Sequence, residues 1–121
     1  DYLVIVITNQ SGVSRGYFNE EDLRKLHNWM NDELKKENAR IDDFFYCTDL
    51  PNNNVKSRRK PSPAMINEAF NKYFISKKGS FLIGDKESDI ISAKKARIEG
   101  FLFEGGDLFD MIQKILKKNL I

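Results

Sequence analysis

Residues 2–12 of the chain read YLVIVITNQSG, an unbroken apolar run that passes directly into a polar segment. The run at residues 2–7 is rich in β-branched side chains, which is typical of a parallel strand buried on both faces. Residues 8–12 then follow the carboxyl end of this strand, and ligands bind at that end in parallel α/β sheets. The stretch therefore predicts both the class of the fold and the edge where functional residues should lie.

The rest of the chain continues this alternation of short apolar runs and amphipathic stretches. Further strands are predicted at residues 44–47, 80–83 and 101–103, and helices at residues 20–38, 63–73, 87–97 and 107–118. Asn19 is the predicted N-cap of the first helix, Ser62 of the second, and Gly100 is expected to mark the end of the third. The order β-α-β-α-β-α-β-α predicts a parallel sheet covered by helices, in a single domain over residues 1–121.

Composition excludes several classes of protein. The 121 residues are 40% hydrophobic and 31% charged, which suits one soluble globular domain, and the net charge of +2 is too small to imply a nucleic-acid partner. No apolar run approaches the roughly 20 residues that span a bilayer, and no signal peptide is visible. The single cysteine, Cys47, excludes an internal disulfide. A cytoplasmic protein without a membrane partner is expected.

Three segments carry candidate chemistry, and the first is the one that follows the opening strand. The hydroxyl, amide and backbone N–H groups of residues 8–12, followed by Arg15 and Gly16, could donate hydrogen bonds to phosphate oxygens. Asn, Ser and Gly are equally common in an ordinary turn, so this segment alone leaves both interpretations open.

The second segment is basic and precedes a predicted helix. Arg58, Arg59 and Lys60 stand before Pro61, and a cation held there would neutralise charge on a transferring phosphoryl group. The alternatives are a solvated basic loop or a nucleic-acid patch, although no aromatic residues are interleaved with these charges.

The third segment is acidic and follows an apolar strand. Asp85 stands at the carboxyl end of that strand, and Asp89 comes four residues later on the same side. Two carboxylates so placed can hold Mg²⁺, one directly and one through water. Capping of the following helix is the alternative, but the position of Asp85 at the strand end favours the metal.

The ordered set of these segments resembles the haloacid dehalogenase superfamily. In detail it is similar to the D-glycero-D-manno-heptose 1,7-bisphosphate phosphatases and their histidinol-phosphatase relatives. The matching segments are Thr8-Asn9-Gln10-Ser11-Gly12 with Arg15-Gly16-Tyr17-Phe18, Arg59-Lys60-Pro61, and Gly84-Asp85-Lys86 with Ser88-Asp89. They extend over essentially the whole chain in the order expected of the family.

The resemblance implies a Rossmann-like three-layer α/β/α fold and a role for each matching residue. Thr8 and Lys60 would stabilise the transferring phosphoryl group, with Arg59 beside them. Asp85 would ligate Mg²⁺, and Asp89 would support the metal or its loop without being a direct ligand. The residues that would contact substrate are Thr8, Asn9, Gln10, Ser11, Arg59, Lys60 and Lys86.

Two departures from the family pattern carry expectations of their own. The first strand of the family, with its Asp-x-Asp nucleophile motif, has no match here. It would lie between the strands that end at Ile7 and Ile83, so we expect a gap in the sheet, a longer natural protein, and an inactive, aggregation-prone chain on its own. The zinc loop of many relatives is reduced to Cys47, with Lys56 and Arg58 in place of two cysteines, so no structural zinc is expected. His27 is expected to be a surface or packing residue.

These observations favour a Mg²⁺-dependent phosphomonoester hydrolase acting on a small sugar phosphate, heptose 1,7-bisphosphate first among them. An aspartate upstream of this chain would attack phosphorus and form an aspartyl-phosphate. The alternative is a non-catalytic phosphate-binding or partner-binding module, which the absent Asp-x-Asp favours and the retained Thr8, Lys60 and Asp85 oppose. A monomer is the favoured oligomeric state.

Overall fold

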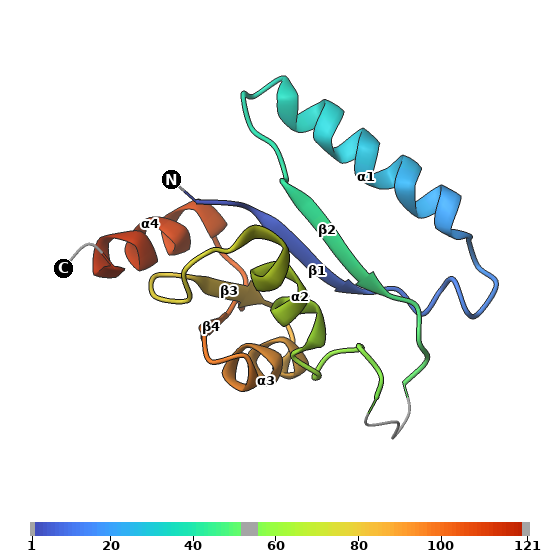
Figure 1. Cartoon of the computed structure of the whole chain (residues 1–121). Helices are drawn as coiled ribbons and strands as arrows, with labels where there is room; N and C mark the ends of the chain where they lie inside the picture. Colours follow the sequence, from blue (N-terminus) through green and yellow to red (C-terminus); the bar gives the residue numbers. More distant parts are fainter. Residues whose placement is uncertain (1, 52–55, 120–121) are drawn as a thin grey trace.

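The structure is a computed structural model, and it describes residues 2–51 and 56–119. Strands and helices alternate along these residues, as the sequence predicts (Figure 1). The elements are β1 (Ile5–Asn9), α1 (Glu20–Lys35), β2 (Asp43–Cys47), α2 (Ala64–Tyr73), β3 (Phe81–Gly84), α3 (Glu87–Lys95), β4 (Glu99–Leu102) and α4 (Leu108–Asn119). Within the described ranges, none of the helices has the length and apolar character needed to cross a membrane. The polar stretch at residues 51–59 predicts a loop, and its residues 52–55 lie outside the described residues.

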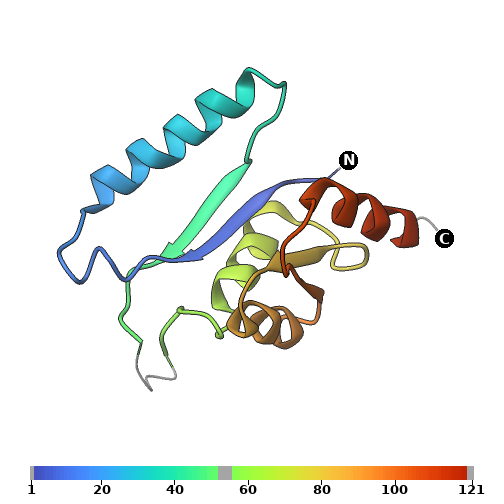
Figure 2. The same cartoon turned by 180° about the vertical axis from the view of Figure 1, so that it is seen from behind.

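The strands form two parallel pairs. β1 pairs with β2 from Ile5 opposite Asp43 to Asn9 opposite Cys47. β3 pairs with β4 from Phe81 opposite Glu99 to Gly84 opposite Leu102. In the part of the chain that the structure describes, no strand pairing joins the two pairs, and β1 and β3 are the strands that face each other across the interruption in both views (Figures 1 and 2). The parallel α/β architecture is therefore confirmed, together with the expected gap between the strands that carry Ile7 and Ile83.

Helices cover both faces of the β1–β2 pair. On one face, the ring of His27 in α1 stacks on Phe44 with centroids 3.8 Å apart, and Tyr46 lies close by. On the other, the Lys72 amine of α2 lies 5.8 Å from the ring of Phe45. Because successive side chains of a strand point to opposite faces, α1 and α2 lie on opposite sides of the pair. This arrangement gives the three layers of the expected fold.

Helix α3 packs tightly on β3 and β4, and this contact corrects one expectation. Gly100 does not mark the end of the helix but lies inside β4, where an added Cβ would be 3.0 Å from the Cβ of Ala93. Ala93 is fully buried, so the glycine allows the helix to approach the strand closely. The left-handed residue that follows α3 is Arg97, with φ of 62°.

Two other boundaries are displaced from their predicted positions. β1 begins at Ile5 rather than residue 2, because Tyr2, Leu3 and Val4 are exposed and the pairing with β2 starts only at Asp43. As a result Thr8 and Asn9 are the last two residues of the strand instead of the first two of a loop. The second predicted helix starts at Ala64, and its N-cap is Pro63 rather than the predicted Ser62. The Ser62 hydroxyl lies one residue further back and accepts from the Ala64 N–H at 3.2 Å.

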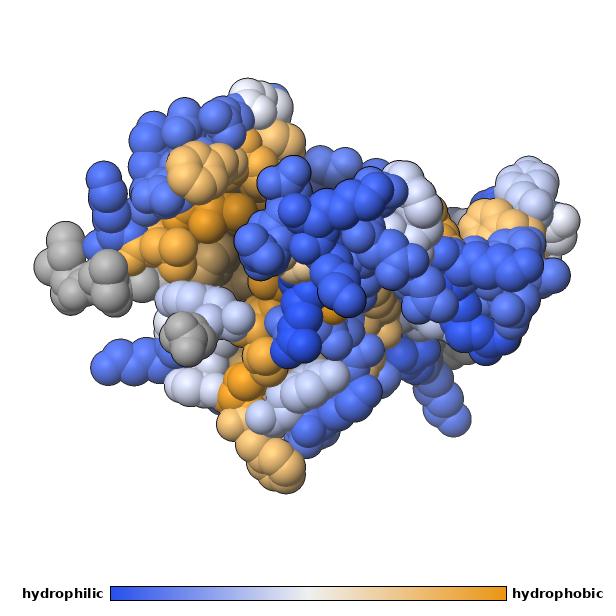
Figure 3. All heavy atoms as spheres, turned by 90° about the horizontal axis from the view of Figure 1, so that it is seen from above, coloured by the Kyte–Doolittle hydropathy of each residue, from blue (hydrophilic) through white to orange (hydrophobic). Residues whose placement is uncertain are grey.

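Helix α4 is only partly covered by the other described elements. Ile115 is buried, but Leu108 and Phe109 in its first turn are exposed. In Figure 3, apolar atoms are concentrated toward the left, the end of the molecule where Figure 1 places α4. The apolar face of this helix is therefore only partly buried by the rest of the described chain.

Candidate active site

The carboxyl end of β1 carries a short chain of polar contacts. The Gln10 side-chain amide donates to the Thr8 hydroxyl oxygen at 3.0 Å, and the Gln10 N–H donates to the Cys47 carbonyl at 2.7 Å. The Thr8 hydroxyl itself reaches only the Asn9 carbonyl, at a long 3.5 Å. Gln10 therefore orients the Thr8 oxygen, while the hydroxyl proton is held weakly enough to turn toward a bound anion.

Asn9 fixes the basic segment to this strand end. Its Oδ1 accepts from the backbone N–H of Lys60 at 3.0 Å, and its Nδ2 donates to the Lys60 carbonyl at 3.4 Å. Both polar groups of the Lys60 backbone are thus paired with one side-chain amide. Two residues that are 51 positions apart in the sequence are held together in this way.

The Lys60 amine lies between the two strand pairs. Its Nζ donates to the Ile7 carbonyl of β1 at 3.0 Å and to Oδ1 of Asp89 in α3 at 2.5 Å. The side chains of Lys60 and Asp89 are only 12% and 8% exposed. A buried ammonium and carboxylate in contact compensate each other's loss of hydration, and these two bonds use two of the three N–H groups of the ammonium.

Asp89 is fully engaged by the protein, whereas Asp85 is not. The second oxygen of Asp89 accepts from the Lys86 N–H at 3.2 Å, which caps the start of α3. Gly84 makes room for this carboxylate, because an added Cβ would lie 2.3 Å from the Cβ of Asp89. Asp85 is exposed at the end of β3, and its side chain has no hydrogen bond or ion pair to any described residue.

Asp85 and Asp89 are the two carboxylates that were expected to bind or support Mg²⁺. The described residues contain no group of three or more His, Cys, Asp or Glu side chains that could hold a metal ion. Mg²⁺ commonly takes only one or two carboxylates and completes its octahedral shell with water and phosphate oxygens. The exposed oxygens of Asp85 fit such an ion, while Asp89 is held by Lys60 and fits the supporting role expected of it.

The other predicted site residues lie around this centre. The Arg59 guanidinium donates to the Asp49 carbonyl at 3.1 Å, on the loop that follows β2. The Ser11 hydroxyl accepts from Arg15 at 3.5 Å, and the side chain of Lys86 is exposed beyond β3. The structure therefore brings Lys60 and Asp89 into direct contact, and Lys60 is bonded to Ile7 and Asn9, the two residues that flank Thr8.

The loop around Cys47 is held by hydrogen bonds. The Ser57 hydroxyl donates to the Asp49 carboxylate at 2.6 Å and lies 4.0 Å from the Cys47 sulfur. The hydrogen bond from Ser57 lowers the pKa of Asp49, which stays ionised. Arg58, in the place of a zinc-binding cysteine according to the resemblance, forms an ion pair with Glu68 of α2.

Sequence reasoning missed three features of the site. One is the contact of Lys60 with Asp89, since nothing in a 29-residue separation indicates an ion pair. The other is the packing role of Gly84, although the Gly-Asp pair at a strand end was a signal that the backbone turns there. The third is the pair of hydrogen bonds between the Asn9 side chain and the Lys60 backbone, which neither spacing nor composition predicts.

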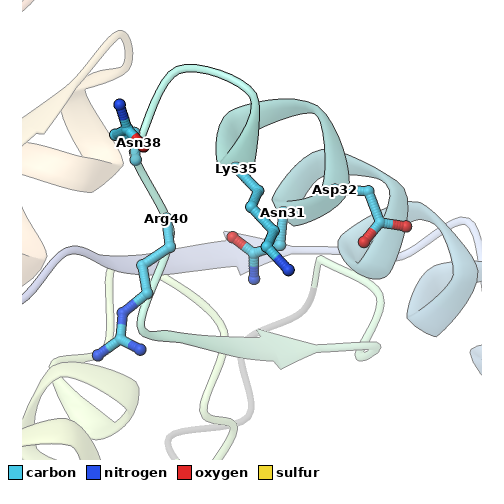
Figure 4. A pocket seen from close by; sticks show the side chains of 6 residues that line it. Asn31, Asp32, Lys35, Asn38 and Arg40 are labelled. Atoms are coloured by element: carbon cyan, nitrogen blue, oxygen red, sulfur yellow. The ribbon is translucent and has the colours of Figure 1, made fainter.

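A shallow hollow elsewhere on the surface lies apart from these residues. It has a volume of about 440 Å³ and lies where α1 ends and the chain turns toward β2 (Figure 4). Its lining residues are Asn31, Asp32, Lys35, Asn38, Ala39 and Arg40. It therefore flanks the amino end of β2, opposite the end where Thr8 and Lys60 lie.

Comparison with known proteins shows which family the chain belongs to. The family described as "Haloacid dehalogenase-like hydrolase" matches residues 25–102. The chain is 43% identical to D-glycero-beta-D-manno-heptose-1,7-bisphosphate 7-phosphatase of Rhodopseudomonas palustris, over 95% of this chain and 67% of that protein. The chain belongs to the haloacid dehalogenase-like hydrolases. A second relative, D-glycero-alpha-D-manno-heptose-1,7-bisphosphate 7-phosphatase of Photorhabdus laumondii, is 42% identical over 80% of this chain and 56% of its own length.

Solved structures of haloacid dehalogenase-like hydrolases share the fold. D,D-heptose 1.7-bisphosphate phosphatase from B. bronchiseptica, complexed with magnesium and phosphate, has a TM-score of 0.79 and 28% identity, covering 94% of this chain and 63% of that one. A putative had-like phosphatase from Mesorhizobium loti has a TM-score of 0.80 at 24% identity, which supports the fold alone. The chain spans about half to two thirds of the length of these curated relatives.

Proposed function

We propose that these residues form the phosphate-binding part of a Mg²⁺-dependent phosphatase that acts on a small sugar phosphate, with heptose 1,7-bisphosphate as the first candidate. The observation that carries the proposal is the Lys60 amine, held with little exposure between Asp89 and the carbonyl of Ile7, the residue before Thr8. The relatives named as heptose-bisphosphate phosphatases support the choice of substrate.

In this proposal the chain's own residues bind and polarise the phosphoryl group. Thr8 donates its hydroxyl proton to one phosphoryl oxygen, and Lys60 places its remaining N–H on another. Gln10 and Asn9 keep these two groups at fixed positions through their hydrogen bonds. A cation and a hydroxyl held in this way lose little free energy to reorganisation when negative charge develops on the phosphoryl oxygens.

In this proposal the attacking group is an aspartate upstream of this sequence, whose 121 residues contain no Asp-x-Asp pair. One aspartate oxygen would form a bond to phosphorus while the bond to the sugar oxygen breaks, and the second aspartate would protonate that oxygen. Water would then hydrolyse the aspartyl-phosphate and release inorganic phosphate. We propose that the Asp-x-Asp pair lies on a strand between β1 and β3. Lys60 lies at this place, since its amine bonds both the Ile7 carbonyl of β1 and Asp89 of α3.

The proposal assigns the metal to Asp85. A bound Mg²⁺ would supply positive charge that offsets the charge of the phosphate oxygens and of the attacking carboxylate. Asp85 has an exposed carboxylate with no competing partner among the described residues, so it can bind the ion without breaking an internal contact. Asp89 instead keeps Lys60 and the start of α3 in place.

The main experiment compares the 121-residue chain with the full protein encoded by its gene. We expect the full protein to release phosphate from heptose 1,7-bisphosphate and from simpler sugar phosphates with Mg²⁺, and the 121-residue chain to be inactive by several powers of ten. Comparable activity in the shorter chain would overturn the assignment of the nucleophile. Inactivity of a full protein that carries an Asp-x-Asp would instead point to a different substrate class.

The metal assignment is tested by Asp85→Ala in the full protein, with Glu87→Ala as the matched control. Glu87 is an exposed carboxylate two residues away in the first turn of α3. We expect a loss of Mg²⁺-dependent turnover for Asp85→Ala and near wild-type turnover for Glu87→Ala. Equal turnover of the two variants would rule out a metal role for Asp85.

The absence of structural zinc is a separate proposal. Cys47 is buried and lies against Ser57, while Arg58 pairs with Glu68. Elemental analysis of the dialysed protein should therefore give less than one zinc per chain. Stoichiometric zinc would show that the loop after β2 was misassigned.

A second candidate function is a phosphate-binding or partner-binding module without catalysis. The lack of an Asp-x-Asp pair in these 121 residues favours it. Reading the gene upstream of Asp1 separates the candidates: an Asp-x-Asp after an apolar strand supports the phosphatase, and its absence supports the module.

A further inference from the structure

Arg58 connects three elements at the edge of the candidate site. Its Nε and Nη2 donate to the two carboxylate oxygens of Glu68 in α2, at 2.6 and 2.8 Å. Its Nη1 donates to the carbonyl of Tyr46 in β2 at 2.9 Å. The guanidinium therefore forms a bidentate pair with a helix and a third bond to a strand, from a position in the loop between them.

The chain that follows Arg58 carries the two predicted catalytic cations. Arg59 and Lys60 are the next two residues, and both have backbone N–H groups in hydrogen bonds, to Ser57 at 3.1 Å and to Asn9 at 3.0 Å. Asn9 holds Lys60 from the β1 side only. Arg58 holds the same segment from the side of β2 and α2, so the path of the chain into Arg59 and Lys60 is fixed at both ends.

We propose that Arg58 is a positioning residue that holds Arg59 and Lys60 in place through Glu68 and the Tyr46 carbonyl. This inference rests on the proposed phosphatase function, in which Lys60 contacts the phosphoryl group. In this inference Arg58 acts through the segment that it holds and not on the substrate, since all three of its guanidinium nitrogens bind protein groups.

The geometry of the pair makes Arg58→Lys an informative variant. Lysine keeps the positive charge and can approach Glu68, but a single ammonium cannot reproduce the flat fork that binds both Glu68 oxygens and the Tyr46 carbonyl. About two fifths of each side chain of the pair is exposed, so the charge itself contributes little to stability. Loss of these guanidinium hydrogen bonds should therefore make Arg59 and Lys60 more mobile without unfolding the protein.

The test measures steady-state kinetics with a sugar phosphate in the full protein for wild type, Arg58→Lys and Glu68→Gln. A displacement of the Lys60 amine by about 1 Å can cost up to about 100-fold in rate. We expect a 10- to 100-fold lower kcat, a KM within about three-fold of wild type, and an unchanged thermal midpoint. Arg24→Gln, which removes the exposed Arg24–Glu21 pair of α1, is the matched control and should leave kcat unchanged.

Hydrogen exchange of the Arg59 and Lys60 amides provides a readout that does not depend on activity. These amides should exchange at least ten-fold faster in Arg58→Lys than in wild type, while the amides of α1 are unaffected. Unchanged exchange, or a wild-type kcat in an active protein, would overturn the positioning role. An inactive wild type with faster exchange in Arg58→Lys would refute the phosphatase proposal but uphold Arg58 as the residue that fixes this segment.

Discussion

Gly84 ends β3 directly against the side chain of Asp89. A Cβ at this position would lie 2.3 Å from the Asp89 Cβ and 2.4 Å from its Oδ2. The Asp89 carboxylate is also the partner of Lys60, so a displacement at Gly84 reaches the candidate site. Gly84 has no reactive side chain, but the space it leaves allows Asp89 to lie where it can pair with Lys60.

We predict that Gly84→Ala lowers the free energy of unfolding by about 1–3 kcal/mol, because the extra carbon overpacks a closed site. Urea unfolding checks this value. Gly100→Ala is the comparison, since its Cβ would meet Ala93 at the longer distance of 3.0 Å, and its loss should be smaller. A Gly84→Ala protein as stable as wild type would show that Asp89 moves without cost.

His27 packs against the sheet, since its ring stacks on Phe44 with centroids 3.8 Å apart. Burial lowers the pKa of His27 below its usual 6.5. The unfolded chain therefore binds a proton more readily than the folded one, and protonation favours unfolding. The free energy of unfolding contributed by this group falls as the pH drops through 6.5 toward the folded pKa.

His27 is the single histidine of the sequence, which makes the pH prediction specific. Between about pH 8 and pH 5, wild type should lose stability in urea unfolding, and His27→Gln should lose less. Equal pH dependence of the two proteins in this range would show that the ring titrates alike in both states.

Among the elements, α1 has the start that its sequence predicts. The Asn19 side chain accepts from the Asp22 N–H at 2.8 Å, and the Asp22 carboxylate accepts from the Asn19 N–H at 3.0 Å. Three acidic residues in the first turn also favour this end of the helix dipole. Local sequence is sufficient here because every partner lies within one turn.

We predict that Asn19→Ala costs about 1 kcal/mol of stability through loss of this cap. Asn28→Ala, the same change at an exposed position in the middle of α1, should be neutral or slightly stabilising because alanine is the better helix former. Chemical denaturation of both variants measures the difference. Equal effects would mean that the cap contributes nothing beyond helix propensity.

On the scale of the whole molecule, the two strand pairs are connected by side chains rather than by a strand ladder in the described residues. The Lys60–Asp89 ion pair is the most buried of these links, and Lys60 also reaches the backbone of β1. Each half contributes one parallel pair with its helices, and the candidate site forms where the halves meet.

Removal of one member of this pair should destabilise the whole fold. We predict a loss of about 3 kcal/mol for Asp89→Asn and for Lys60→Met, since each leaves a buried charge without its partner. The double variant should lose clearly less than the sum of the two, which a double-mutant cycle in urea measures. Additive losses would show that the two residues act independently.

Prediction from the sequence succeeded where the signal is local. The apolar runs and caps indicated the order of strands and helices, and the Asn19 cap and Ser62 contact lie within a few residues of their partners. It failed where distant residues decide the outcome. Gly100 reads as a helix end but lies in β4 because α3 packs on it, and β1 starts late because its partner strand starts at Asp43.

The sequence by itself determined the α/β class, the parallel strands and the strand ends at which polar residues gather, because periodicity and residue type act over short distances. Only the tertiary structure decided which of those polar groups meet. Asn9 with the Lys60 backbone, Lys60 with Asp89, and Arg58 with Glu68 are pairs that folding brings together from 10 to 51 residues apart. Their partners are fixed by the packing of α2 and α3 against separate strand pairs, and no spacing along the chain encodes that packing.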